Sequence, residues 1–497
     1  MMNPKDKKRK EQVAHIIEIP YEYRLVVDDQ EGVDDPYHLL WWGHKEDEEK
    51  KIQITLNRHT GNLFEFRIDD ENYFSSDKEV IEENKAREIA NVFIKKYVEE
   101  LEFYTYVSVK DDWRGWKEIN YMQEVNGYPL PNTGCVVRIH PSGNVVHFHY
   151  NGQKAIEKKP LWPIEIVEEN AVLETLRARQ DMRLVFVDLT HSSCKYENGE
   201  EVKGYHLVYE PEPSHAFIDA STGKDLFDPD HYKLPPTVAV EKPKKVSQQD
   251  DIFDLFDWDK ESFTKVAETE NEDGIRMKFV SKEELQKQKE EKNPYLMNEF
   301  FKKHLPMLKY NNLVGITIDK STNELIGFIK LADDKEVKQI LSREECLQKA
   351  LQFLEHVIPD VTQYLRLWDE RDEDEGIERF VFSVYVNEIP VEYREFMVNI
   401  NAENGAVMHY SGKPSNIIEE LLAHETAPKV TKEKALEIYK EVIRVKLEWC
   451  IDHDAEEMKY KLLYKQTRSE NHKESVGCSR KIRYIDAHTG EKIWSEY

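Results

Sequence analysis

Apolar residues recur along this chain with two periods, and each period predicts one kind of element. Four segments repeat them roughly every 3.6 residues, which is typical of an amphipathic helix. In the first segment Ile81, Ile89, Val92 and Phe93 follow this period, and in the last Thr431 precedes the pattern as an N-cap residue. The predicted helices cover residues 75–100, 166–179, 342–357 and 431–447.

Extended segments follow each predicted helix, and they are rich in the β-branched and aromatic residues that favour strands. They are residues 104–109, 119–125, 182–189, 205–209, 361–368, 380–386 and 458–464. A helix therefore repeatedly precedes a set of strands. This order predicts an α+β protein made of tandem units, in which a helix covers one face of a small antiparallel sheet.

Six short segments of similar sequence predict hairpin turns within these units. Each begins with Asp, Asn or His, and each carries a Gly or Asn that suits a positive φ angle. A leading Asp or Asn side chain can also accept hydrogen bonds from the turn amides. The turns lie at residues 57–62, 140–144, 219–224, 319–324, 401–406 and 486–491. Their recurrence, about every 80 to 100 residues, indicates an internal repeat.

The six units are predicted to form two duplicated halves of three units each. A Pro-containing, polar stretch at residues 234–249 separates the third turn from the fourth and has the composition of a linker. The first half therefore covers residues 1–235 and the second half residues 261–497. A linker and an acidic-aromatic segment occupy residues 236–260 between them.

Two matching motifs carry a resemblance to a known family. Val125-Asn126-Gly127-Tyr128-Pro129-Leu130 in the first half pairs with Val386-Asn387-Glu388-Ile389-Pro390-Val391 in the second, and a hairpin follows each. This pattern of strand, Gly-x-Pro-hydrophobic stretch, Asx-x-x-x-Gly turn and Tyr-bearing strand resembles the YcdB/YcdC-type repeat of bacteria, which is itself similar to the small PepSY module. Two positions depart from it, because Glu388 stands where Gly127 does and Asn323 replaces a turn glycine.

The resemblance implies a fold and a class of partner. The implied fold is an α+β protein of PepSY-like repeats that covers most of the chain outside the linker. PepSY modules are associated with inhibiting or chaperoning peptidases, often outside the membrane. The implied partner is therefore a peptidase or another protein.

Composition excludes some functions. The formal net charge is −27, and such a surface repels phosphate backbones and anionic membranes, so neither nucleic acid nor a membrane is an expected partner. No apolar run reaches the 18 residues that a membrane helix needs. The five cysteines are scattered and form no C-x-x-C pair, so we interpret them as reduced. These features predict a soluble, cytoplasmic protein.

Histidines give the only candidate metal ligands. His147 and His149 fall on one face of a predicted strand, and His140 lies across the same hairpin, so three nitrogen donors could meet a zinc ion. No carboxylate or cysteine at ligand spacing supports them. An exposed polar face behind a buried Phe148 is the favoured interpretation, and we expect no metal and no cofactor.

No known catalytic motif is present. His424-Glu425 begins like the zinc-protease motif, but Pro428 stands where the second histidine is needed and would break the helix. The chain contains neither a phosphate-binding glycine loop nor a G-x-S-x-G nucleophile motif. With 97 acidic residues in the chain, a general acid–base pair cannot be chosen from the sequence.

The most unusual segment follows the linker, at residues 250–259, where acids alternate with large apolar residues. The apolar residues of interest are Ile252, Phe253, Leu255, Phe256 and Trp258. One interpretation is that this segment docks on the second half of its own chain as a bridge between the halves. The other is that it is a docking peptide for a partner protein, since acidic-aromatic segments enter apolar grooves.

The sequence therefore favours a non-enzymatic function. The leading hypothesis is a protein-binding or peptidase-regulating scaffold, because a repeated framework is combined with no recognisable catalytic constellation. The alternative is an enzyme with a site in the groove between the halves, which would use carboxylates together with His147 or His149.

Overall fold

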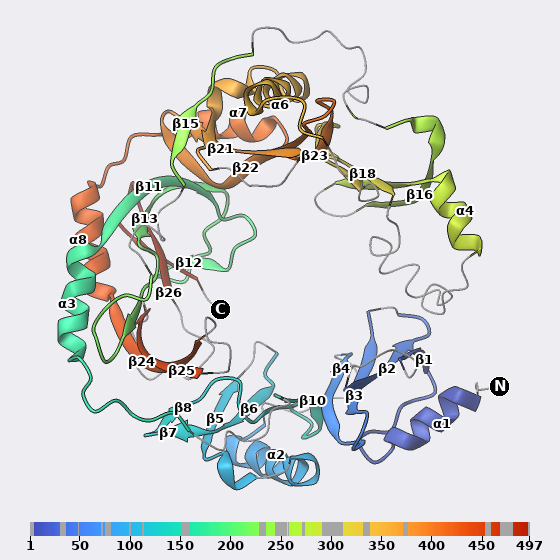
Figure 1. The fold of residues 1–497 in the computed structure, drawn as a ribbon. Helices are drawn as coiled ribbons and strands as arrows, with labels where there is room; N and C mark the ends of the chain where they lie inside the picture. The colour runs from blue at the N-terminus through green and yellow to red at the C-terminus, as the bar shows by residue number, and fades with distance from the viewer. Residues whose placement is uncertain are drawn as a thin grey trace.

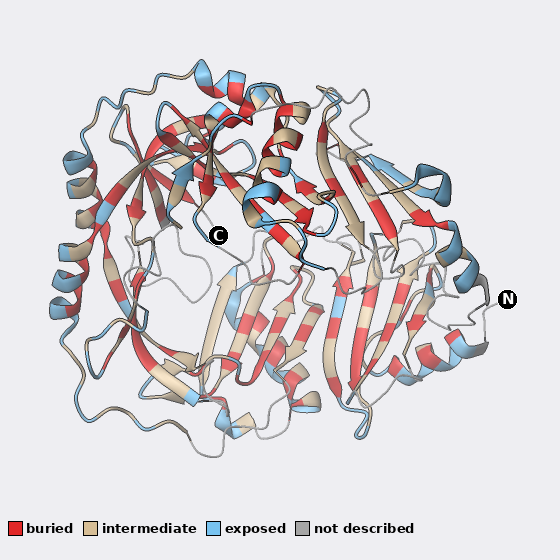
Figure 2. Cartoon of the chain, turned by 45° about the horizontal axis from the view of Figure 1, so that its top comes forward, coloured by how far each residue is buried: buried red, intermediate tan, exposed pale blue. Residues whose placement is uncertain are grey.

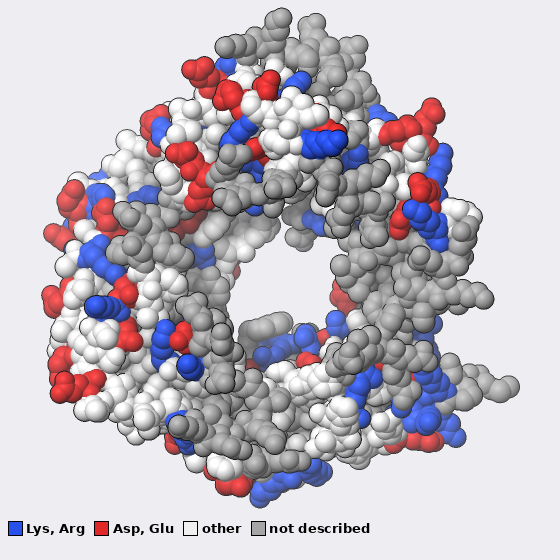
Figure 3. Space-filling model, in the orientation of Figure 1, with Lys and Arg blue, Asp and Glu red and all other residues white. Residues whose placement is uncertain are grey.

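The computed structural model describes residues 4–29, 36–47, 49–70, 73–74, 81–98, 101–111, 114–151, 159–227, 235–243, 256, 258–270, 274–290, 312–331, 338–370, 376–452, 459–467 and 481–495. The chain forms antiparallel sheets arranged around a central opening, which is visible in Figures 1 and 3. Most helices lie on the outer side of the sheets. They are α1 (Pro4–Val13), α2 (Glu83–Tyr97), α3 (Glu169–Arg179), α4 (Lys282–Glu290), α6 (Arg343–Val357), α7 (Asn416–Leu422) and α8 (Lys432–Val442). The predicted α+β class is confirmed.

The first assembly is an eight-stranded antiparallel sheet with the order β1-β2-β3-β4-β10-β9-β6-β5. Its strands are β1 (Tyr23–Asp28), β2 (Tyr37–His44), β3 (Lys51–Asn57), β4 (Leu63–Asp69), β5 (Tyr106–Asp111), β6 (Lys117–Met122), β9 (Cys135–Ile139) and β10 (Val145–Tyr150). Helix α2 packs on β6, β9 and β10. Ala86, Ala90 and Ile94 of α2 are buried against Ile119, Val137 and Phe148 of the sheet, so the core lies on this one face.

The second assembly repeats this order as β16-β17-β18-β19-β23-β22-β21-β20. Its strands are β16 (Phe263–Glu270), β17 (Ile275–Ser281), β18 (Leu313–Ile318), β19 (Leu325–Leu331), β20 (Leu365–Trp368), β21 (Ile377–Val386), β22 (Ile389–Asn401) and β23 (Val407–Ser411). Helix α6 takes the place of α2 and begins with a capping box at Ser342 and Glu345. In Figure 2 the buried residues of both assemblies lie where helix meets sheet.

Strands from the two halves of the chain share the remaining sheets. These strands are β11 (Asp181–Asp188), β12 (Cys194–Tyr196), β13 (Tyr205–Glu212), β14 (Phe217–Asp219), β24 (Arg444–Asp452), β25 (Lys459–Thr467), β26 (Lys481–Asp486) and β27 (Lys492–Ser495). Strand β13 pairs with β26, and β14 pairs with β25. Helix α8 packs on β11, β13 and β26, while α3 packs on β24. The third and sixth predicted units have thus exchanged their middle strands.

The second assembly is joined directly to this exchanged sheet. Strand β22 runs parallel to β11, with Phe186 opposite Val391, so that the described strands form one 14-stranded sheet. Three further short strands are described: β7 (Glu124–Val125) pairs with β8 (Tyr128–Pro129), and β15 (Thr237–Ala239) pairs with β20. Residues 237–239 of the predicted linker are therefore part of a sheet.

The six predicted turns are confirmed as hairpin ends. The Asp219 carboxylate accepts hydrogen bonds from the backbone N–H groups of Ser221 and Thr222, and Asp319, Asn401 and Asp486 accept equivalent bonds. Asn323 holds a φ of 57° where the other turns have glycine. Local side-chain chemistry therefore determines these turns.

Several predicted helix boundaries are wrong. Residues 81–82 and 166–168, predicted as helical, precede α2 and α3, which begin at Glu83 and Glu169. The helix predicted over residues 431–447 ends at Val442, and residues 444–452 form β24. The apolar residues after Val442 continue a helical spacing, yet they also alternate with polar ones, and this second pattern is the one that packs against β25. Among the described residues, no helix has the length and apolar character to cross a membrane.

Candidate functional site

The first assembly carries an apolar groove with a volume of about 630 Å³. Its walls come from five separate segments: the loop after α1, strand β4, residues 73–74, helix α2 and the β9–β10 turn with the start of β10. The lining residues are Ile16, Ile17, Glu18, Pro20, Phe66, Tyr73, Phe74, Ile89, Val92, Phe93, Lys96, Gly143, Asn144 and Val145. A volume of this size lies within the range of about 300–1,000 Å³ that ligand pockets occupy.

Helix α2 forms one wall because only part of its apolar surface is used by the core. Ala86, Ala90 and Ile94 face the sheet, whereas Ile89, Val92 and Phe93 line the groove. The Phe93 ring lies 5.4 Å from that of Phe148 on β10, so Phe93 packs against the sheet. Val92 is 62% exposed, so an apolar side chain at the rim faces solvent.

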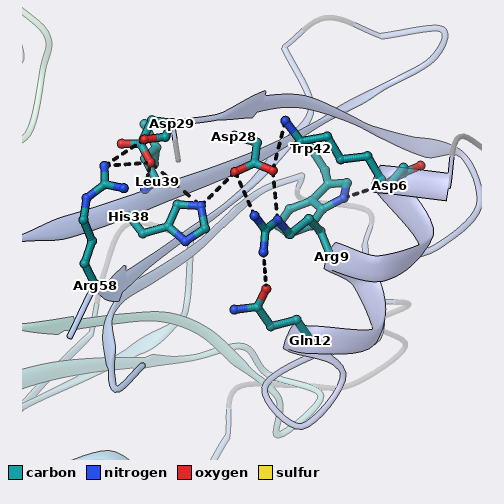
Figure 4. Close-up of polar contacts among 10 residues, drawn as sticks. Asp6, Arg9, Gln12, Asp28, Asp29, His38, Leu39, Trp42 and Arg58 are labelled. Atoms are coloured by element: carbon teal, nitrogen blue, oxygen red, sulfur yellow. Dashed lines mark hydrogen bonds and ion pairs between the residues drawn. The ribbon is translucent and has the colours of Figure 1, made fainter. Parts of the chain in front are cut away.

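A buried polar network fixes α1 on the outer strands (Figure 4). Asp28 accepts a 2.9 Å hydrogen bond from Arg9 Nε and lies 2.8 Å from His38 Nε2. Burial alone would raise the pKa of Asp28, but the Arg9 guanidinium and His38 hold that pKa below its usual range. Trp42 Nε1 donates to the Asp6 carboxylate at 3.0 Å. This network orients the helix that leads into the groove wall.

The loop after α1 is held from both sides. Lys10 Nζ donates to the carbonyl oxygens of Pro20 and Tyr23, at 2.9 and 2.6 Å. Tyr73 Oη donates to the Glu18 carbonyl oxygen at 2.6 Å, and Tyr97 Oη donates to the backbone of the same loop at 3.1 Å. The wall that carries Ile16 and Ile17 is therefore fixed before any ligand binds, which lowers the ordering entropy that binding must overcome.

The candidate histidines are placed by strand register. His147 lies opposite Arg67 and Arg138, and His149 lies opposite Glu65, so both occupy the sheet face opposite α2. Burial, together with the charge of Arg138, lowers the pKa of His147 to about 3, so its ring is neutral at physiological pH. His140 instead accepts a 3.1 Å bond from the Ser142 backbone N–H in its own turn. Within the described ranges, no group of three or more potential ligands is placed to hold a metal ion.

The acidic-aromatic segment packs on the second assembly. Phe256 is buried in the main core cluster, with its ring 3.6 Å from that of Phe328, and Trp258 lies beside Phe263 and Phe279. The other apolar members of the segment, Ile252, Phe253 and Leu255, lie outside the described residues. Binding of a partner by this segment stays a prediction.

A pair of carboxyl groups lies where the second assembly meets the exchanged sheet. Glu392 of β22 is close to Glu210 of β13, and Tyr484 Oη of β26 donates to Glu392 Oε2 at 3.1 Å. Burial and the neighbouring Glu210 carboxyl raise the pKa of Glu392 to about 8. Arg183 pairs with Glu210, and Glu392 is the carboxyl of the pair that keeps its proton at neutral pH.

A second cavity, of about 700 Å³, lies on the second assembly and has a cationic wall. Arg276, Lys278, Arg394 and Lys413 line it together with His409 and Gly315, among others. Burial and the charge of Arg276 lower the pKa of Lys278. This cavity is more polar in character than the groove of the first assembly, and its cations could attract an anionic group.

The groove is not predicted by the sequence. Its walls come from segments up to about 130 residues apart, and such long-range contacts have no local signature. One signal was present: Val92, Phe93 and Ile89 were recognised as apolar positions of a helix. When the apolar surface of a helix is wider than the stripe that faces the core, the remaining apolar residues are available for a second contact.

Comparisons with known proteins agree with the repeated architecture. The family model described as the YcdB, YcdC repeated domain matches twice, at residues 6–152 and 276–414. The first match spans α1 to β10, and the second spans β17 to just beyond β23. The two matches therefore correspond to the two assemblies, except that the second match leaves out β16.

Two proteins of Bacillus subtilis (strain 168) are similar over the whole chain. The uncharacterized protein YcdB is 25% identical over 98% of this chain and 97% of its own length. The uncharacterized protein YcdC is 24% identical over 99% of each chain. Among solved structures, the Bacillus megaterium YpeB C-terminal domain is 16% identical, covers 47% of this chain and 87% of its own, and superposes with a TM-score of 0.22. The two family matches together span more than half of the sequence, and the chain belongs to the YcdB/YcdC repeated-domain family.

Proposed function

We propose that this protein is a non-enzymatic protein-binding scaffold, and that the groove of the first assembly is its contact site. The observation that carries the proposal is a preformed apolar groove with an exposed rim residue, Val92. Contiguous apolar surface that is rimmed by polar residues is typical of protein contact sites. Glu18 and Lys96 supply polar groups at this groove.

Site-specific photocrosslinking tests the proposal. A photoreactive phenylalanine derivative in place of Val92 should give a crosslinked adduct of defined mass in cells that make the full-length protein. The matched control places the same derivative at Asn84, which is exposed on α2 but does not line the groove. Adducts that are absent at both positions, or equal at both, would contradict the proposal.

The kind of partner is part of the proposal. The resemblance to PepSY modules supports a peptidase whose activity the scaffold inhibits or chaperones. The activity of a peptidase recovered by the crosslink should change when the purified protein is added, and it should not respond to the Val92→Glu variant. A peptidase that responds equally to both proteins would be a partner of some other surface.

The finer organisation belongs to the same proposal. We infer six PepSY-like units in two halves, with boundaries at residues 1–235, 236–260 and 261–497, and a cytoplasmic location. Support comes from the six matching turns and from the equal strand order of the two assemblies. A bacterial fractionation experiment on the native protein would test the location independently of the fold.

A second candidate function is favoured by one observation, the carboxyl pair of Glu210 and Glu392. A carboxyl that keeps its proton beside a second carboxyl is an arrangement suited to general acid–base catalysis, and the two come from different halves of the chain. His147 and His149 lie on the other assembly, and no contact in the described ranges links them to this pair. Turnover in a substrate screen that is lost in Glu392→Gln, and kept in His149→Ala, would support this alternative.

A further inference from the structure

In the second assembly, Phe256 of the same chain occupies the place that corresponds to the groove of the first assembly. Phe256 stacks on Phe328 with the ring centroids 3.6 Å apart and the ring planes 4° from parallel. It also lies 5.7 Å from the Phe353 ring of α6 and forms a parallel backbone bridge with Val407. Only 5% of Phe256 is exposed, so its ring fills the space between the helix and the sheet.

Strand register identifies the matching residues of the first assembly. Phe66 lies opposite Phe148 as Phe328 lies opposite Tyr410. The helix aromatics correspond in the same way, because Phe93 lies 5.4 Å from Phe148 and Phe353 lies 5.0 Å from Tyr410. Val145 and Val407 are each the first residue of the strand after the turn.

All three counterparts of the residues that contact Phe256 line the groove of the first assembly. They are Phe66, Phe93 and Val145. The incoming chain also corresponds, since Phe256 precedes the first residue of β16 by the same number of positions as Ile16 precedes that of β1. The smaller Ile16 lies on the wall of the groove instead of filling it.

We propose that the groove of the first assembly takes the phenylalanine side chain of an acidic peptide segment of a partner protein. This inference rests on the proposed function and names the ligand. The second assembly is the precedent, because the residue that occupies its site is a phenylalanine. In the sequence, Asp254, Asp257 and Asp259 flank this phenylalanine. Lys96 lines the groove and is a cation that such a segment can contact.

The chemistry of the groove fits this ligand. A phenylalanine ring in the place of Phe256 would lie against two aromatic rings, and offset or stacked aromatic contacts add attraction beyond the burial of area. The parallel bridge between Phe256 and Val407 places the backbone of Phe256 beside the first residue of the strand. Peptides bound in this way use backbone bonds for affinity and side-chain pockets for specificity.

Fluorescence anisotropy with a synthetic peptide tests the inference on the full-length protein. The probe is a labelled peptide with the sequence of residues 250–259. We expect saturable binding, and at least tenfold weaker binding of the same peptide carrying F256A. Equal affinity of the two peptides would overturn the proposal.

Protein variants locate the binding to the groove. Val92→Glu places a charged group at the rim and should weaken the peptide at least tenfold. Asn84→Glu adds the same charge to an exposed position of the same helix and should leave binding unchanged. Both substitutions are on exposed residues, and circular dichroism should show the wild-type fold for both. Equal weakening by the two variants would mean that peptide binding responds only to the added negative charge and not to the groove, and would overturn the proposal.

Two further results separate this inference from the proposed function. Loss of peptide binding while the crosslink at position 92 persists would overturn the identity of the ligand and leave the scaffold function intact. Sedimentation of the full-length protein tests a different occupant. Self-association that is abolished by Val92→Glu would make a second copy the occupant, and would overturn the partner proposal.

Discussion

The two assemblies share one strand order but differ at the two places where they meet other segments. The aromatic site between helix and sheet holds Phe256 in the second assembly and is an open groove in the first. The same framework therefore serves as an internal joint in one copy and offers a surface in the other. Because the second assembly holds residue 256 at this site, the matching site of the first assembly is available for another ligand.

The second difference concerns the strand that leaves each assembly. In the second assembly β22 is continuous from Ile389 to Asn401 and pairs with β11 through Val391. In the first assembly β8 and β9 are separated by residues 130–134, and Leu130, which matches Val391 in register, is instead buried among α3, β24 and β25. Continuity brings Glu392 to the carboxyl pair, at the position where the first assembly has Pro131.

The largest effect should come from emptying the filled aromatic site. Phe256→Ala removes a buried ring that contacts Phe328 and Phe353, and such a change lowers the free energy of unfolding by about 3–5 kcal/mol. Ile16→Ala, at the matching place of the first assembly, should lower it by about 1 kcal/mol, because Ile16 is only partly buried. Urea unfolding of both variants measures the difference, and equal losses would mean that Ile16 fills the first site as fully as Phe256 fills the second.

The next effect should come from the break between β8 and β9. Gly134 has a φ of 72°, and a Cβ atom on it would lie 1.9 Å from the carbonyl oxygen of Tyr121. Gly134→Ala therefore combines an unfavourable φ with a backbone clash, and should lower the free energy of unfolding by more than about 2 kcal/mol. Gly61→Ala is the control, since its φ is similar and nothing lies within 4 Å of the added Cβ. A similar loss in both variants would show that the φ angle alone matters.

The carboxyl pair should give the second assembly a fall in stability as pH rises, with Glu392 as its source. Glu392 keeps its proton up to a pKa of about 8 in the folded protein, while in the unfolded chain its pKa is the ordinary glutamate value of about 4.5. The folded state then binds more protons, so stability falls as pH rises from about 4.5 to about 8, by at most about 1.4 kcal/mol per pH unit. Glu392→Gln should remove this slope when unfolding is measured at several pH values.

The control for the pH experiment is Glu419→Gln, an exposed acid on α7. It should leave the slope as it is in the wild-type protein. A slope that persists in Glu392→Gln would show that another group carries the extra proton. Activity screens can be run on the same variants, because the proposed alternative function uses the same carboxyl.

Local chemistry explains what could be predicted from the sequence. The turns were found because Asp219 and its counterparts bond amides only two or three positions away. Helices α2 and α6 were found from spacing alone. The prediction failed after Val442, where apolar residues fit both a helical and an alternating period and only the pairing of β24 with β25 decides between them.

Long-range pairing explains what could not be predicted. Strand β13 pairs with β26 although about 280 residues separate them, and nothing in either strand specifies that partner over its sequence neighbour β14. The groove has the same origin, because Ile17, Phe66, Val92 and Val145 meet only after folding. Phe256 was recognised as unusual, but its partner on β19 could not be chosen from sequence.

The smallest effect should come from the turn that carries the family motif in each assembly. Asn126 and Gly127 have φ angles of 52° and 80°, and Asn387 and Glu388 have 49° and 67°. A left-handed conformation costs a residue with a side chain about 1 kcal/mol relative to glycine, so the second assembly carries strain that the first avoids. Glu388→Gly should raise the free energy of unfolding by about 0.5 kcal/mol, since part of the gain is offset by the greater freedom of glycine in the unfolded chain.

Glu388 also forms an ion pair with Arg366, and this contact must be separated from the strain. Glu388→Gln removes the charge but keeps a side chain in the left-handed conformation, so it should lower stability slightly, by at most about 0.5 kcal/mol for so exposed a pair. Both variants lack the ion pair, so the difference between them is the relief of strain less the added freedom of glycine in the unfolded chain, about 0.5 kcal/mol. If Gln and Gly gave the same stability in thermal unfolding, the glycine of the first assembly would have no conformational advantage, and the two turns would differ in sequence without differing in energy.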